Sequence, residues 1–144
     1  MADNSIREYY LEKGNNCAET TLHIVNDKYS LGLSEEDFKL VGAFGAGLGC
    51  GITCGALCGA MAALGKMAIT GRAHGTEGFK ELCADYVAAF REKMTSTDCE
   101  KIKETFFCDD GTRCIKTVEA NAILFDEYVA AHGLVKPEDN EWRS

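Results

Sequence analysis

The amino-acid sequence predicts an all-α fold, a single-domain helical bundle of about six to seven helices. Apolar residues recur every three or four positions along most of the chain, and no segment shows the strict alternation of a half-buried strand. The chain contains one proline, Pro137, in 144 residues, so long helices are left unbroken. Hydrophobic residues make up 46% of the chain, enough for one core at this length. We therefore expect a single helical domain over residues 1–144, with 137–144 as a loose tail.

The first two helices are predicted from their boundary residues. A short helix over residues 5–13 is expected to end at the glycine that follows it. A longer helix over residues 17–29 comes next, and Asn16 with Glu19 has the spacing of a capping box at its start. This boundary places Cys17 in the first turn of the second helix.

The central helices are predicted around a glycine-rich segment. Ser34 and Asp37 resemble a capping box, which starts a third helix that fades into the glycines from residue 42 onwards. A fourth helix is expected over residues 53–67. It should be the most buried helix, because no charged residue precedes Lys66 in it.

Three further helices complete the predicted bundle. The first is long, spans residues 76–94 and carries a regular apolar stripe. A short helix over residues 98–107 and a last helix over residues 113–132 follow it. The stripe of the long helix consists of Phe79, Cys83, Tyr86, Phe90 and Met94.

Two stripes of small residues are predicted around the start of the fourth helix. Cys50, Cys54 and Cys58 are spaced four apart, and a glycine follows each of them. Residues four apart on a helix are turned by only about 40°, so the cysteines form one stripe and the glycines a second stripe beside it. We expect the glycines to let another helix approach closely; the alternative is that they leave room for a cluster or a flat cofactor. The glycine-lined and aromatic-lined helices are also candidate contacts in a homodimer.

Composition and charge restrict the function. The formal net charge is −8 and no basic run occurs, so we expect no binding to nucleic acid. Residues 40–65 carry no charge, but eight of them are glycine, so a membrane span is not expected. The N-terminus lacks the apolar core of a signal peptide, which predicts a cytoplasmic protein whose eight cysteines stay reduced.

Half of the cysteines fall at predicted helix starts. They are Cys17, Cys54, Cys99 and Cys114. For the last two, Thr97 and Thr112 are the expected caps. A helix N-terminus offers free N–H groups and partial positive charge, which lower the pKa of a thiol and favour the thiolate. The alternative is that each cysteine is a small apolar residue that fills a first turn.

Helix parity predicts that these cysteines meet at one end of the bundle. If consecutive helices run antiparallel, the second, fourth and sixth helices start at the same end, which brings Cys17, Cys54 and Cys99 together. Cys114 joins them if the sixth helix acts as a cap that returns the chain to that end. A helix of about ten residues is only about 15 Å long, which is short enough to do so.

The other cysteines carry weaker signals. Cys83 belongs to the apolar stripe and is expected in the core. Cys58 lies one turn along the fourth helix and is a candidate cofactor-binding residue of the thiol site, with simple packing as the alternative. Cys50 lies in glycine-rich backbone, and Cys108 competes with Cys114 as the fourth cysteine of the site.

The segment C-G-A-L-C-G at residues 54–59 resembles the CGAxxG motif of the putative redox-active C_GCAxxG_C_C proteins. The resemblance covers most of the chain, through the segments NCAETTL, DCEKIK and RCIKTVEANAILFDEYV. It implies a redox-active protein whose hallmark cysteines are Cys17, Cys54, Cys99 and Cys114. These are the same residues that the predicted helix starts indicate.

Three functions remain open from the sequence, and whether the protein is an enzyme is open with them. The first is thiol redox, in which these cysteines cycle between dithiol and disulfide or pass electrons to a redox partner protein. The second is a metal site, in which thiolates of the same cysteines bind an iron–sulfur cluster or another metal. The third is a structural or interaction protein with packing cysteines. No CxxC occurs, so a thioredoxin-type motif and a zinc ribbon are absent, and without CxxCH a c-type haem is excluded.

Overall fold

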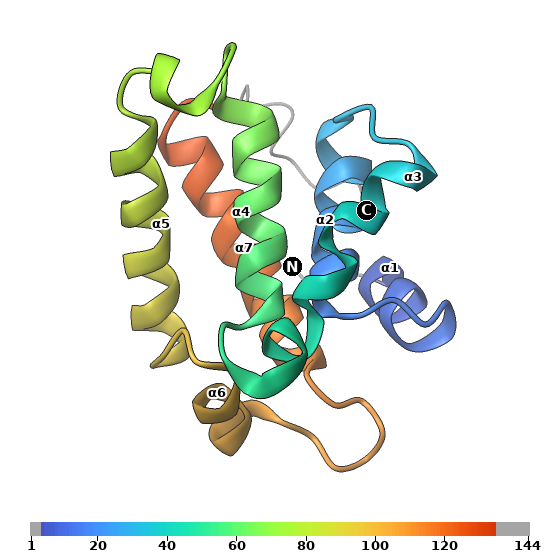
Figure 1. Ribbon diagram of the computed structural model, residues 1–144. Coiled ribbons are helices and arrows are strands. Elements are labelled where there is room, and N and C mark those ends of the chain that lie inside the picture. The colour runs from blue at the N-terminus through green and yellow to red at the C-terminus, as the bar shows by residue number, and fades with distance from the viewer. Residues whose placement is uncertain (1–3, 135–144) are drawn as a thin grey trace.

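The computed structural model describes residues 4–134 and confirms the all-α prediction (Figure 1). Within these residues the chain forms seven α-helices and no β-strand. Their bounds are α1 Asn4–Arg7, α2 Cys17–Tyr29, α3 Glu35–Phe38, α4 Gly55–Ala68, α5 Phe79–Met94, α6 Cys99–Phe106 and α7 Ile115–Ala131. Short 3-10 or π-helical turns occupy Glu8–Glu12, Lys39–Phe44, Gly47–Gly51 and Ala73–Gly75. The predicted tail, residues 137–144, lies outside the described residues.

The other three long helices pack around α4. This helix contacts α2, α5 and α7, and α2 also contacts α7. The short helix α6 lies across one end of the bundle, while α1 and α3 flank α2 on the far side from α5 (Figure 1). No helix in residues 4–134 is both long enough and apolar enough to cross a membrane.

The core contains a buried polar bridge that ties three of these helices together. The Tyr86 hydroxyl on α5 donates to Asn121 Oδ1 on α7 at 2.5 Å. The amide of Asn121 donates in turn to the Ala56 carbonyl on α4 at 2.9 Å. Because both side chains are fully buried and mutually satisfied, this bridge fixes the register of the three helices without an unpaired polar group.

Helices α2 and α4 approach each other closely, because glycines of α4 present no side chain where α2 crosses it. A Cβ built on Gly59 would lie 2.5 Å from the Ala18 carbonyl oxygen, closer than side-chain carbons approach backbone. A Cβ built on Gly55 would overlap the sulfur of Cys17 and lie 2.8 Å from the Phe44 carbonyl oxygen. The expectation that these glycines admit a neighbouring helix is confirmed, and the neighbour is α2.

The turn before α4 corrects the two predicted stripes. The helix starts at Gly55 and not at residue 53, because Thr53 pairs with Asp98 in a backbone bridge and Cys54 still has non-helical backbone. Cys50 and Gly51 lie in this turn, off the helix axis. The prediction of three-membered stripes is therefore wrong for the first member of each, and Cys50 is exposed to solvent.

Helix caps agree with the sequence at α2 and differ at α6 and α7. The Asp98 carboxylate caps α6 by accepting the Glu100 N–H at 3.1 Å, so Thr97 is not the cap. Cys114 itself is the capping residue of α7, and the Thr112 hydroxyl donates to a neighbouring aspartate instead. The long helix predicted from residue 76 starts later, at Phe79, directly after Gly78, whose backbone is left-handed.

The close crossing of α2 and α4 makes a testable prediction about stability. Gly59→Ala should destabilise the protein by about 1–3 kcal/mol, because α2 has to move away from the added methyl group. Gly65→Ala is a matched control in the same helix, where a Cβ would meet only the Ile69 side chain at an ordinary 3.7 Å. The control should gain up to about 1 kcal/mol from helix propensity. Urea unfolding followed by circular dichroism measures both variants, and equal stability would contradict the close approach.

Candidate functional site

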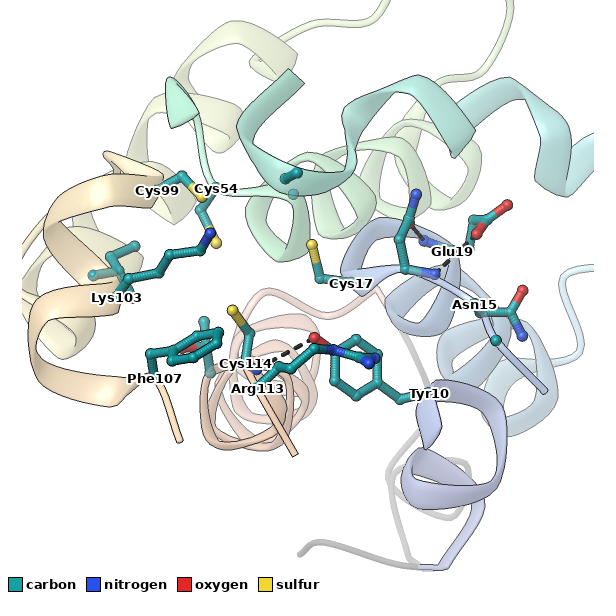
Figure 2. Close-up of a pocket in the computed structure, with 16 residues that line it drawn as sticks. Tyr10, Asn15, Cys17, Glu19, Cys54, Cys99, Lys103, Phe107, Arg113 and Cys114 are labelled. Atoms are coloured by element: carbon teal, nitrogen blue, oxygen red, sulfur yellow. Dashed lines mark hydrogen bonds between the residues drawn. The ribbon is translucent and has the colours of Figure 1, made fainter. Parts of the chain in front are cut away.

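A cavity of about 380 Å³ lies at the end of the bundle where α2, α4, α6 and α7 begin (Figure 2). The backbone or side chains of 16 residues line it. Its cysteines are Cys17, Cys54, Cys99 and Cys114. We call these residues the cavity cysteines. All of them are free thiols.

Cys17 is positioned by the capped start of α2. The Asn16 side chain accepts the Glu19 N–H, and the Glu19 carboxylate accepts the Asn16 N–H, each at 2.9 Å. The Asn16 amide also donates to the Gly42 carbonyl at 2.9 Å, which ties this helix start to the segment before α4. Because Gly55 has no side chain, the sulfur of Cys17 lies against the first residue of α4.

Cys54 and Cys99 are held by a short backbone bridge between two loops. Thr53 pairs with Asp98 in an isolated antiparallel bridge. The Cys54 N–H donates to the Thr97 carbonyl at 2.9 Å, and the Cys99 N–H donates to the Ile52 carbonyl at 2.7 Å. Both residues are almost fully buried, and Figure 2 shows their side chains on the same wall of the cavity.

Cys114 reaches the cavity because the chain turns back after α6. Residues Cys108 and Arg113 form an antiparallel bridge, in which the Cys108 N–H donates to the Arg113 carbonyl at 2.8 Å. The Cys114 N–H then donates to the hydroxyl of the buried Tyr10 at 3.3 Å. The short sixth helix therefore acts as the returning cap that parity required. Cys114, and not Cys108, lines the cavity.

The remaining cysteines lie elsewhere. Cys58, predicted as a cofactor-binding extension of the thiol site, lines a separate cavity with Leu57, Met61 and Val87 instead. It lies one turn beyond Cys54 on α4 and outside the cavity that the other four cysteines line. Burial raises the pKa of the Cys58 thiol, and the nearby charge of Cys17 raises it further. Cys83 stays on α5 and packs against the core, as expected.

Burial opposes the thiolate in this cavity. It raises the pKa of the Cys54 thiol from its ordinary 9.0 to about 12, although the N–H groups of Leu57 and Ala56 pull that pKa down. Burial also raises the pKa of Cys99 and of Cys114. The expectation that a helix N-terminus lowers the thiol pKa is therefore wrong in sign for Cys54, Cys99 and Cys114, because desolvation by burial is the largest effect at each of them.

Two cavity cations were missed by the sequence analysis. Lys103 lies one helical turn after Cys99 on α6, and its charge pulls the pKa of Cys99 and Cys114 downward against burial. Arg113 stacks its guanidinium over the Tyr10 ring, 4.6 Å from the ring centroid. The four-residue spacing from Cys99 to Lys103 is the signal that could have found the lysine, since such residues share a helix face.

The cavity cysteines are the thiol donors that a metal group would need. Among residues 4–134, no three or more His, Cys, Asp or Glu side chains are arranged to hold a metal ion. A single zinc ion needs its thiolates about 2.3 Å away, which requires sulfurs that converge on one point. Thiols spread around a cavity can instead bind a larger group, and cysteine ligation of this number is typical of iron–sulfur clusters.

Fold and site together define an all-α protein with a cavity ringed by free thiols. The chain belongs to the family described as putative redox-active protein (C_GCAxxG_C_C), whose family model matches residues 15–128. The matched range contains every cavity cysteine. Comparison with curated proteins and with solved structures gives no match.

The raised pKa of Cys54 predicts slow alkylation in the native protein. At pH 8 its thiolate fraction should be on the order of 10³-fold below that of a thiol with a pKa of 9.0. Its reaction with iodoacetamide should therefore be far slower than that of the exposed Cys50, and it should speed up about tenfold per pH unit. Peptide mass spectrometry over time measures both sites, with urea-unfolded protein as the control. Equal native rates at Cys50 and Cys54 would contradict the burial of Cys54.

Proposed function

We propose that this protein is a cysteine-based redox protein whose cavity cysteines cycle between dithiol and disulfide. The observation that carries the proposal is that Cys17, Cys54, Cys99 and Cys114 come from separate segments and line one cavity as free thiols. The membership of a family described as redox-active supports it. A purely structural role gives no reason for half of the cysteines to gather around empty space.

The reaction is thiol–disulfide exchange with a partner disulfide. A cavity thiol loses its proton, and the thiolate attacks one sulfur of the partner, which releases the first partner thiolate. A second cavity cysteine then attacks the mixed disulfide and releases the second partner thiolate. Two electrons pass to the partner, the protein gains one disulfide, and the two thiol protons go to the released thiolates.

The arrangement of the thiols supports pairing inside the cavity. The charges of Cys17 and Cys99 act on both Cys54 and Cys114, so these thiols lie near one another. Figure 2 shows the side chains of Cys17 and Cys114 directed into the space that Cys54 and Cys99 also border. Each cysteine therefore has a neighbour that can act as the resolving thiol.

The cellular setting is part of this proposal. Eight unpaired cysteines favour a reducing compartment, where thiols stay reduced between turnovers. We place the protein in the cytoplasm on this ground, with a dithiol- or disulfide-bearing molecule as its redox partner.

An iron–sulfur cluster bound by the cavity cysteines is the second candidate. The specific observation in its favour is the ring of thiols around a cavity next to Gly55 and Gly47, where glycine backbone lies against the sulfurs of Cys17 and Cys99. Such a cluster would supply one-electron transfer when bound. The protein residues would hold it through sulfur and shield it from water.

Thiol counting in a redox buffer tests the main proposal. Reduced wild-type protein, incubated at stepped ratios of oxidised to reduced dithiothreitol, should lose two free thiols per disulfide in a defined transition. A serine variant at any cavity cysteine should shift or abolish the transition in which that residue takes part, while its helical circular dichroism stays unchanged. Cys83→Ser is the matched control and should leave the transition in place. If all four cavity variants titrate like the control, the proposal is wrong.

Anaerobic purification separates the two candidates. The dithiol proposal predicts a colourless protein with no stoichiometric iron. A visible absorption band with bound iron, both lost in the serine variants of the cavity cysteines, would replace it with the cluster. Cys83→Ser again serves as the control that should keep the colour.

A further inference from the structure

The cavity carries positive charge on a protein that is acidic overall. The whole chain has a formal net charge of −8. The charged residues that line the cavity are Lys103, Arg113 and Glu19. The Glu19 carboxylate is engaged at the start of α2, where it accepts the Asn16 N–H at 2.9 Å. Glu19 keeps its negative charge, so these three side chains together carry one net positive charge, and the two basic ones are the groups that can pair with an anion.

Neither cation is neutralised by a carboxylate. Among the described residues, Lys103 and Arg113 take part in none of the ion pairs within 4.0 Å. Arg113 instead stacks on Tyr10, and the amine of Lys103 lies 5.7 Å from the Phe107 ring centroid. An unpaired cation beside a cavity is a site for an anion, because it gains charge-assisted hydrogen bonds at no loss of an existing pair.

The cations flank the thiols. Figure 2 shows Lys103 reaching along one wall toward Cys54 and Cys99, and Arg113 on the other side of Cys114. A molecule with its acidic groups on these cations would place its centre beside the cavity sulfurs. The volume of about 380 Å³ lies at the lower end of the range for small-molecule pockets.

We infer that the cavity takes an anionic low-molecular-weight disulfide, whose carboxylates pair with Lys103 and Arg113 while its sulfurs meet the cavity cysteines. This inference rests on the proposed function and names its substrate class. In the reaction, a cavity thiolate displaces one carboxylate-bearing thiolate from the substrate. A second cavity cysteine displaces the other, so that two anionic thiols leave and one protein disulfide remains.

The charge of the whole protein allows a sharp test, because it acts in the opposite direction. A net charge of −8 attracts cationic molecules at long range, so without local recognition a cationic disulfide should react fastest. Recognition by Lys103 and Arg113 reverses that order. The probes are three disulfides of similar size: the dianion 3,3′-dithiodipropionate, the neutral bis(2-hydroxyethyl) disulfide and the dication cystamine.

The experiment measures the second-order rate at which each probe oxidises the thiols of the native protein. Each rate is divided by the rate for the same protein unfolded in urea, which removes the intrinsic reactivity of the probe. The wild type should prefer the anionic probe over the cationic probe by about tenfold after this division, as expected for charge-assisted contacts. Peptide mapping identifies which cysteines have reacted, so that the rates can be assigned to the cavity cysteines alone.

Substitutions separate recognition from activation of the thiols. Lys103→Gln and Arg113→Gln should each lower the preference for the anion several-fold, while Lys103→Arg should keep it. Loss of the Lys103 charge also disfavours the thiolate, but that effect slows all three probes by the same factor and leaves their ratio unchanged. Lys66→Gln is the matched control, since Lys66 is exposed in the last turn of α4, at the opposite end from Cys54.

The possible outcomes test the preference for an anionic disulfide separately from the proposed redox function. Suppose that the cavity thiols react with all three probes. If they show no preference for the anion, or if that preference survives both glutamine variants, the inference is overturned and the redox function stands. Cavity thiols that react with none of the probes in the native protein overturn both. A preference for the anion that falls in both glutamine variants and survives Lys66→Gln supports the inference.

Discussion

The absence of side chains at Gly55 and Gly59 is the constraint on which the site depends. Because α4 presents bare backbone there, α2 comes close enough for the Ala18 carbonyl to occupy the space of a Cβ. The same approach sets the sulfur of Cys17 against Gly55, next to Cys54. Without this crossing, the thiols at the starts of α2 and α4 would be separated by a layer of side chains, and the cavity would lose one wall.

Burial gives the site its chemical character. The enclosure that gathers the thiols also removes water from them, so the pKa of Cys54 rises to about 12 and those of Cys99 and Cys114 rise as well. Burial therefore favours the neutral thiol at Cys54, Cys99 and Cys114, which avoids the charge repulsion that adjacent thiolates would create. Lys103 offsets part of this effect at Cys99 and Cys114, which makes the lysine the natural partner of any thiolate that forms there.

Local sequence signals predicted the fold and the cysteines that meet at one end of the bundle, but not the other residues that line the cavity. The capping box at Asn16 and Glu19 marks the start of α2, and helix parity predicts which cysteines share an end. The position of Cys50 was not accessible in this way, because left-handed backbone at residues 47–51 decides it. The sequence also did not reveal that Cys54 and Cys58 line different cavities, because the helices packed around each residue decide that. The sign of the pKa shifts could not be read from helix starts either, since desolvation depends on the packing of α6 and α7 over the cavity.

Disulfide mapping tests most directly whether these four thiols form one redox site. Reduced protein is oxidised gently at low concentration, digested without reduction and analysed for linked peptides by mass spectrometry. The account predicts intramolecular links only among Cys17, Cys54, Cys99 and Cys114, with Cys50, Cys58, Cys83 and Cys108 left as free thiols. Links that use the outer cysteines while the cavity cysteines stay free would contradict it.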